Sequence, residues 1–173
     1  MEAFWYVMTI LGTPELWAVL SLGLLALYLA LKHAAPENPL FKRHKTALRK
    51  FLIVFIPSLS AVLLITLGIK SLWYVPRPCI PCTEISLECN PYCDADSSFP
   101  SGHSATIFAV FSSVYLSARK KRLLPVFIIP VMVSVSRVAL GVHTLTDVFG
   151  GAILGLFIPI LVSVIAQKKH KLK

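Results

Sequence analysis

The stretch PSGHSATIFAVFSSVYLSA, residues 100–118, joins a polar tetrapeptide to a run of apolar residues. Similar apolar runs occur at residues 16–31, 51–69, 123–136 and 148–167. A membrane-spanning helix needs about 20 predominantly apolar residues, with about 17 as a lower bound. We therefore expect an all-α integral membrane bundle of five spanning helices, of which those at 16–31, 104–118 and 123–136 are short.

The composition also indicates a membrane protein. Of the 173 residues, 56% are hydrophobic and only 14% are charged, whereas soluble domains carry about 25% charged residues. A chain of this length is expected to form a single domain, residues 1–173. Residues 1–12 are too short to span a membrane, and the aromatic cluster Phe4, Trp5 and Tyr6 predicts an interfacial helix at headgroup level.

The basic residues predict an orientation. Fourteen of the 17 Lys and Arg residues fall within residues 32–50, 119–122 and 168–173. Five spans place these segments on one side of the membrane, which the positive-inside rule makes cytoplasmic. Lys70, Arg77 and Arg137 then lie on the outer side. The net charge of +9 is explained by topology, so no nucleic-acid partner is expected.

The long polar segment at residues 71–100 is the predicted outer loop, and it contains all four cysteines. An outer loop faces an oxidising compartment, which favours two disulfides, although a zinc site and free thiols are alternatives. Three disulfide connectivities are open. The loop also carries four acidic residues, which we expect to form a solvated face, with steering or exclusion of substrates as the alternative. The cysteines and acidic residues are Cys79, Cys82, Cys89, Cys93, Glu84, Glu88, Asp94 and Asp96.

The remaining polar residues suit the hydrolysis of a phosphate ester. His143 and Asp147 would share one face of a helix beginning near residue 143, so that the carboxylate orients the imidazole as a nucleophile. His103 is the candidate general acid, because imidazole titrates near neutral pH. The phosphate would be bound by cations and by the start of a helix, where backbone N–H groups attract anions. The expected phosphate-binding residues are Lys70, Arg77, Ser101, Gly102 and Arg137.

These residues form three clusters in fixed order: Lys70 to Arg77-Pro78, Pro100 to His103, and Ser136-Arg137 to Asp147. The clusters resemble KxxxxxxRP, PSGH and SRxxxxxHxxxD, the motifs of the type 2 phosphatidic acid phosphatase (PAP2) superfamily. The resemblance covers about residues 45–167. It implies a six-helix core, a phosphohistidine intermediate on the third-motif histidine, and hydrolysis without a metal ion or other cofactor.

The resemblance also implies a range of substrates. Family members act on phosphatidic acid, phosphatidylglycerol phosphate, polyprenyl diphosphates and the 1-phosphate of lipid A. The small size resembles the bacterial members, and lipid A 1-phosphate is our first expectation. Phosphatidylglycerol phosphate and undecaprenyl diphosphate are alternatives. A phosphorylated membrane lipid and the bilayer are the expected partners, with no protein partner implied.

The expected location is the cytoplasmic (inner) membrane, with the active site on the periplasmic side. From a different class, a non-catalytic phospholipid-binding or transport protein would also carry polar residues within the membrane. Such a protein would not need a paired histidine and carboxylate. In the last apolar run, the GxxxG spacing of Gly151 and Gly155 predicts close helix packing.

Overall fold

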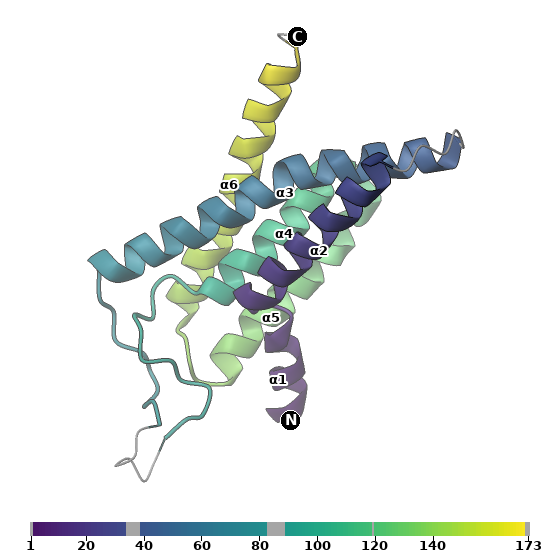
Figure 1. Cartoon of the computed structure of the whole chain (residues 1–173). Coiled ribbons are helices and arrows are strands. Elements are labelled where there is room, and N and C mark those ends of the chain that lie inside the picture. The colour runs from purple at the N-terminus through teal and green to yellow at the C-terminus, as the bar shows by residue number, and fades with distance from the viewer. Residues whose placement is uncertain (1, 34–38, 83–88, 119, 172–173) are drawn as a thin grey trace.

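The computed structural model describes residues 2–33, 39–82, 89–118 and 120–171. This part of the chain forms six α-helices and one 3-10 segment, and contains no β-strand (Figure 1). The elements are α1 (Glu2–Ile10), α2 (Pro14–His33), α3 (Pro39–Leu72), α4 (Gly102–Ala118), η1 (Lys121–Phe127), α5 (Ile128–Ala139) and α6 (Leu145–Lys171). The expected all-α membrane fold is confirmed.

Four segments are long and apolar enough to cross a membrane: Pro14–Lys32, Phe41–Leu72, Arg122–Ala139 and Leu145–Lys168. The fifth expected span, α4, has 17 residues and so lies at the lower bound for spanning. It packs against α2, α3, α5 and α6, and every residue from Ser104 to Val110 is buried. Helix α4 is therefore the centre of the bundle.

Two elements differ from the sequence-based expectation. Helix α3 begins at Pro39, so the basic residues at 42–50 lie on a helix rather than in a linker. Proline suits the first helical position, and Lys and Arg are good helix formers. The fourth apolar run begins as the 3-10 segment η1, which contains Pro125. Helix α5 follows, with Pro130 in its first turn, where a missing N–H is tolerated.

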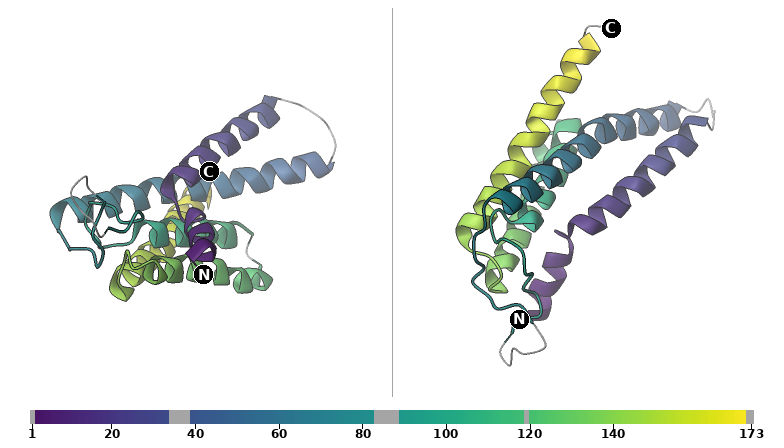
Figure 2. Two further views of the ribbon diagram at one scale, coloured as in Figure 1. Left: turned by 90° about the horizontal axis from the view of Figure 1, so that it is seen from below. Right: turned by 60° about the vertical axis from the view of Figure 1, so that its left-hand side comes forward.

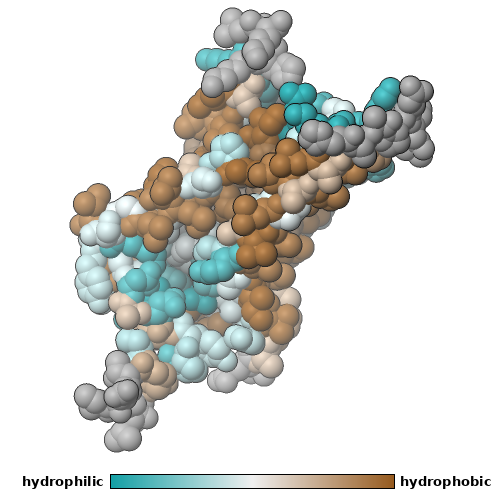
Figure 3. Space-filling model, viewed as in Figure 1, coloured by the Kyte–Doolittle hydropathy of each residue, from teal (hydrophilic) through white to brown (hydrophobic). Residues whose placement is uncertain are grey.

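Large apolar side chains cover the outside of the helices. Leu22, Leu64 and Phe157 are 69%, 70% and 67% exposed, and hydrophobic residues dominate the helical part of the surface in Figure 3. Hydrophilic side chains gather at the end of the bundle that carries the outer loop (Figure 3). This distribution, inverted relative to a soluble domain, is that of an integral membrane protein.

Glycines on α6 allow it to lie directly against α4. A Cβ at Gly151 would overlap the backbone oxygen of Ser101 and would lie 3.0 Å from the backbone nitrogen of Ala105. A Cβ at Gly155 would overlap the oxygen of Ala105. The expected GxxxG packing is confirmed. At the end of this contact nearest the cysteine-containing loop, the Ser101 N–H donates to the Asp147 carbonyl oxygen at 3.0 Å, which joins the second motif to the third.

Helix α1 is separate from α2 and packs beside α5 (Figure 2). Trp5 packs against a buried cluster formed by Cys93, Leu140 and Val142. The neighbouring Tyr6 ring lies 5.3 Å from the ring of Tyr92 in the outer loop. The expected interfacial helix thus forms part of the wall around the outer loop.

The outer loop is cross-linked twice, by Cys79–Cys93 and Cys82–Cys89. The structure therefore selects one of the three possible connectivities, and no described cysteine is free. The Cys79–Cys93 bridge ties the segment after Arg77 to the segment before Asp94. Glu84 and Glu88, two of the four acidic loop residues, lie outside the described residues.

Candidate active site

One cavity collects residues from all three motifs. It has a volume of about 610 Å³ and lies among α2, α3, the outer loop and the start of α4. The expected site residues that line it are Lys70, Arg77, Gly102, His103 and His143. The other three, Ser101, Arg137 and Asp147, are buried behind this lining. The structure thus brings the eight candidates to one place, five on the cavity wall and three supporting it.

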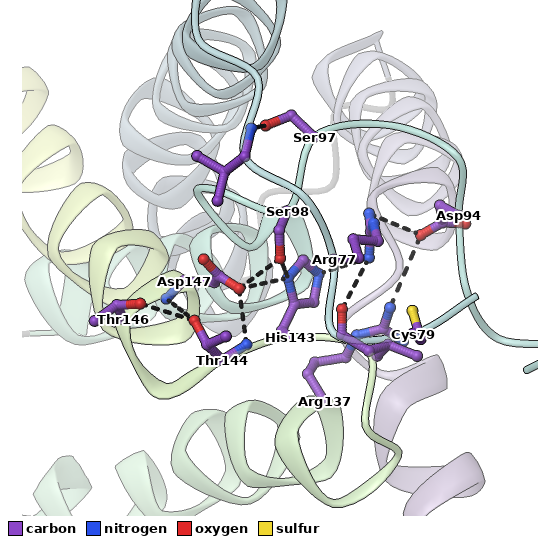
Figure 4. A network of polar contacts seen from close by, with 12 residues as sticks. Arg77, Cys79, Asp94, Ser97, Ser98, Arg137, His143, Thr144, Thr146 and Asp147 are labelled. Atoms are coloured by element: carbon purple, nitrogen blue, oxygen red, sulfur yellow. Dashed lines mark hydrogen bonds and ion pairs between the residues drawn. The ribbon is translucent and has the colours of Figure 1, made fainter. Parts of the chain in front are cut away.

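His143 is held by a buried carboxylate and a buried hydroxyl. Its Nδ1 lies 3.5 Å from Asp147 Oδ2 and 3.3 Å from Ser98 Oγ. Ser98 Oγ in turn donates to Asp147 Oδ2 at 2.5 Å. Figure 4 shows Ser98 and Asp147 together on one side of the imidazole. Because the Ser98 hydroxyl donates its hydrogen to the carboxylate, its oxygen can accept a hydrogen bond from the Nδ1–H of His143.

The other imidazole nitrogen faces Arg77. Arg77 Nη1 lies 3.1 Å from His143 Nε2 and donates to the Val142 carbonyl oxygen at 3.3 Å. A guanidinium has donors only, so this contact requires an unprotonated Nε2 and places the ring proton on Nδ1. Burial, followed by the charges of Arg77 and Arg137, lowers the pKa of His143 to about 3. The ring is therefore neutral at neutral pH, with its lone pair directed toward the cavity.

Asp147 also belongs to the start of α6. The helix begins at Leu145, two residues after His143, so the two side chains do not share a helix face as expected. Thr144 precedes the helix and its N–H donates to Asp147 Oδ2 at 2.7 Å. The Asp147 N–H reaches Thr144 Oγ1 at 3.4 Å. This reciprocal pair is a capping box, which fixes the carboxylate beside His143.

The two described acidic residues of the outer loop contact the cations. Lys70 Nζ donates to Asp96 Oδ2 at 2.6 Å, and Arg77 Nη2 donates to Asp96 Oδ1. Asp94 Oδ2 lies 3.2 Å from Arg77 Nη2 and 3.9 Å from Arg137 Nη2, as Figure 4 shows. Both residues are exposed, as expected of a solvated face, but the expectation missed that their carboxylates contact all three cations of the motifs.

Asp96 is charged in this setting. Burial raises the pKa of its carboxyl, but hydrogen bonds from Lys70 and Arg77 outweigh that effect and leave the pKa below its ordinary value. Lys70 also donates to the Ser97 carbonyl oxygen at 2.6 Å. The Lys70 and Arg77 side chains are only 10% and 4% exposed, so their charges lie in a medium where ionic contacts are stronger than in bulk water.

Helix α1 supplies a residue that sequence reasoning missed. Arg137 Nη1 donates to Thr9 Oγ1 at 2.8 Å, and both side chains are buried. Three residues after Thr9, Gly12 approaches the site closely, since a Cβ there would lie 3.1 Å from His103 Cβ. Gly12, between α1 and α2, therefore packs over His103, and Thr9 at the end of α1 binds the Arg137 guanidinium.

The start of α4 differs in part from the expected anion site. Gly102 lines the cavity, but the Ser101 N–H is already donated to Asp147. Ser101 Oγ is fully buried and, within the part of the chain that the structure describes, has no hydrogen-bond partner. Gly102 is thus the member of this pair that can approach a bound anion directly.

Some of the contacts that sequence analysis missed could have been predicted from the sequence, and others could not. Thr144 and Asp147 have the spacing of a capping box, T-x-x-D, which could have been recognised. Ser98, Asp94 and Asp96 lie in a loop without a periodic pattern, and nothing in their local sequence predicts a contact with Lys70 or His143. The missed residues join separate chain segments rather than extending a motif.

Two solved structures share the fold. A transmembrane PAP2 type phosphatidylglycerolphosphate phosphatase from Bacillus subtilis superposes with a TM-score of 0.69 at 25% sequence identity, over 96% of this chain and 77% of that chain. Aquifex aeolicus LpxE superposes with a TM-score of 0.66 at 20% identity, over 93% of this chain and 84% of that chain. The second likeness supports the fold alone.

A curated relative supports the same grouping. Phosphatidylglycerophosphatase B of Bacillus subtilis (strain 168) is 39% identical over 85 residues, which is 43% of this chain and 42% of the relative. The chain thus matches less than half the length of that relative. The model of the PAP2 superfamily matches residues 46–171, a span that contains all three motifs and the cavity residues described above, and the chain is a member of the PAP2 superfamily.

Proposed function

We propose that the protein is a phosphatase that removes a phosphate group from a membrane lipid. The observation that carries this proposal is the position of His143, whose Nε2 lies 3.1 Å from Arg77 Nη1 in the wall of the cavity. An anion that binds Arg77 and Lys70 would take the Arg77 donor from Nε2 and lie beside the lone pair of a nucleophile. A protein that only binds lipid headgroups has no need for this arrangement.

The reaction proceeds in two steps. His143 Nε2 attacks phosphorus, forming an N–P bond as the bond between phosphorus and the lipid oxygen breaks. His103 protonates the departing oxygen, while Asp147 stabilises the positive charge that develops on the His143 ring. Water then attacks the phosphohistidine with His103 as the base, which releases inorganic phosphate and restores both histidines.

The cations hold the phosphate during both steps. Lys70 and Arg77 bind oxygens that do not react, and Arg137 adds charge from behind the cavity wall. Each hydrogen bond to a charged group contributes about 1.5–3 kcal/mol. Within the described residues, no group of three His, Cys, Asp or Glu side chains is suited to hold a metal ion. We therefore propose that the fixed cations stabilise charge in this reaction, and we expect activity in excess chelator.

The shape of the cavity supports a lipid substrate. Its wall includes Ala18 on α2, and Leu63 and Leu67, which precede Lys70 on α3. Leu67 is 62% exposed, so the apolar side of the cavity continues onto the surface that contacts lipid. A headgroup phosphate can thus bind at the polar end while its acyl chains stay in an apolar environment.

We infer phosphatidylglycerol phosphate as the first substrate to test. The curated relative and one of the solved structures carry names for this activity. Lipid A 1-phosphate and undecaprenyl diphosphate belong in the same panel. We further propose that the site faces away from the cytoplasm in the inner membrane, because the cation-rich segments lie at the opposite end of the bundle.

The test is phosphate release by the purified full chain in detergent from each lipid of the panel, with and without chelator. We expect release from at least one lipid, inhibition by vanadate, and loss of turnover in His143→Ala. Lipid binding without phosphate release would instead support the non-catalytic alternative. Activity lost in chelator and restored by a divalent ion would refute the metal-free mechanism.

A further inference from the structure

The carboxylates of Asp94 and Asp96 occupy the cations that the proposed reaction needs for phosphate. Asp96 places one oxygen on Lys70 and the other on Arg77. Asp94 bridges Arg77 and Arg137. Asp96 thus joins two cations through its two oxygens, as two oxygens of a phosphate group would do, and Asp94 joins two cations through Oδ2. Both residues also line the cavity that holds His103 and His143.

We propose that Asp96, assisted by Asp94, is a built-in competitor for the phosphate site and makes the site selective for dianionic phosphate monoesters over monoanionic diesters. This inference rests on the proposed function, because it assigns phosphate binding to Lys70 and Arg77. It adds two residues that determine specificity and that belong to none of the three motifs.

The backbone on both sides of Asp94 and Asp96 is anchored, whereas their side chains can still rotate. On one side the Cys79–Cys93 disulfide fixes the residue before Asp94. On the other side Ser97 Oγ accepts from the Val75 N–H and donates to the Trp73 carbonyl oxygen, both at 3.0 Å. A tethered group acts at a high effective concentration, millimolar or above for a short link. Any incoming anion must compete with it.

The side chains themselves can leave the cations. Asp94 and Asp96 are 61% and 51% exposed, so each carboxylate can turn toward water while the backbone stays anchored. The cations cannot follow, because Arg77 and Arg137 side chains are only 4% exposed. Exchange of a carboxylate for a phosphate therefore requires a side-chain rotation and leaves the cation framework intact.

The charge of an incoming anion determines whether it can displace the aspartate carboxylates from the cations. A phosphate monoester carries a charge of about −1.5 to −2 at neutral pH, more than either carboxylate. A phosphodiester headgroup carries a single negative charge, no more than the tethered carboxylate it would have to displace. Bilayers consist largely of phosphodiester lipids, so a site of three uncompensated cations would be filled by them. The aspartates prevent this while admitting the monoester.

The test compares wild type with Asp96→Asn, which removes the charge and keeps the shape. Two competitive inhibitors are titrated at low ionic strength in mixed micelles: orthophosphate, and phosphatidylglycerol as the phosphodiester. In Asp96→Asn we expect the inhibition constant for orthophosphate to fall about fivefold to tenfold. We also expect phosphatidylglycerol to become an inhibitor at mole fractions that leave wild type unaffected. Asp94→Asn should shift both in the same direction by a smaller factor, since its contacts are longer.

Glu15→Gln is the matched control. Glu15 lines the same cavity, and among the described residues no ion pair joins it to Lys70, Arg77 or Arg137. Its removal should leave both inhibition constants within about twofold. If turnover of Asp96→Asn is too low for inhibition assays, orthophosphate binding is measured by titration calorimetry on the same protein.

The outcomes separate this inference from the proposed function. Weaker or unchanged orthophosphate binding in Asp96→Asn, with an active wild type, overturns the inference and makes Asp96 a residue that merely positions the cations. Equal shifts in Asp96→Asn and Glu15→Gln also overturn it, since they would reflect total charge alone. A wild type that releases phosphate from no lipid of the panel refutes the proposed function instead.

Discussion

Removal of the Ser98 hydroxyl tests the orientation of the proposed nucleophile. Ser98 Oγ donates to Asp147 Oδ2 at 2.5 Å and lies 3.3 Å from His143 Nδ1, and its side chain is fully buried. Since His143 and Asp147 are 3.5 Å apart, beyond a normal hydrogen bond, the serine provides the shorter link between them. Ser98→Ala removes this link and touches neither Lys70 nor Arg77.

The expected effect follows from the strength of the lost contact. A hydrogen bond to a charged group is worth about 1.5–3 kcal/mol, and each 1.36 kcal/mol changes a rate about tenfold. We expect kcat to fall about 10-fold to 150-fold in Ser98→Ala. KM should stay within about threefold, because the phosphate-binding cations are unchanged. Phosphate release from the best lipid of the panel, measured over a range of lipid mole fractions, separates the two constants.

The matched control is Ser113→Ala. Ser113 is also fully buried, and its Oγ donates only to the Ala109 carbonyl oxygen within α4. This control should keep kcat within about twofold of wild type, so that loss of a buried hydroxyl as such is excluded. A folded Ser98→Ala protein with a kcat within threefold of wild type would refute the proposed link. A rise in KM at constant kcat would show that Ser98 acts on the loop instead.

Three further predictions follow from the packing and charges. Gly151→Val should force α6 away from α4 and abolish turnover with a lower unfolding temperature, whereas Gly23→Val, where nothing lies within 4 Å, should leave both close to wild type. Thr9→Val should raise KM several-fold, because Arg137 loses the acceptor that holds it at 2.8 Å; an unchanged KM would remove α1 from the site. Because the folded state lowers the pKa of His143 from 6.5 to about 3, the unfolded chain binds more protons in that window, and stability falls as pH drops through it. His143→Gln should therefore flatten the decline of unfolding temperature between about pH 6.5 and 3, and an identical decline in both proteins would contradict the shift.

The membrane fold was predictable because hydropathy is a local property. Runs of apolar residues at 16–31, 51–69, 104–118, 123–136 and 148–167 correspond to helices that the structure contains. Family membership was predictable for a similar reason, since each motif is a short stretch of fixed spacing. Element boundaries were less well predicted. The start of α3 at Pro39 was missed because basic residues interrupt the apolar pattern without interrupting the helix.

The sequence alone also identified the residues of the candidate site, whose roles stay predictions, but it did not establish how they are held. His143, Asp147 and the three cations were named from their spacing, and the structure places them around one cavity. Their partners could not be named, because a contact between distant segments leaves no periodic trace. Thr9 and Arg137 are 128 residues apart in the chain, and Ser98 and Asp147 are 49 apart.

The acidic loop shows most clearly what only tertiary structure decides. Asp94 and Asp96 stand in a polar, cysteine-rich segment, where charged residues are ordinarily solvated. Two disulfides and the hydrogen bonds of Ser97 fold that segment back over the ends of α3 and α5. A carboxylate and a cation attract each other strongly only when they lie within a few ångströms. That distance is set by the packing of helices that are far apart in the sequence.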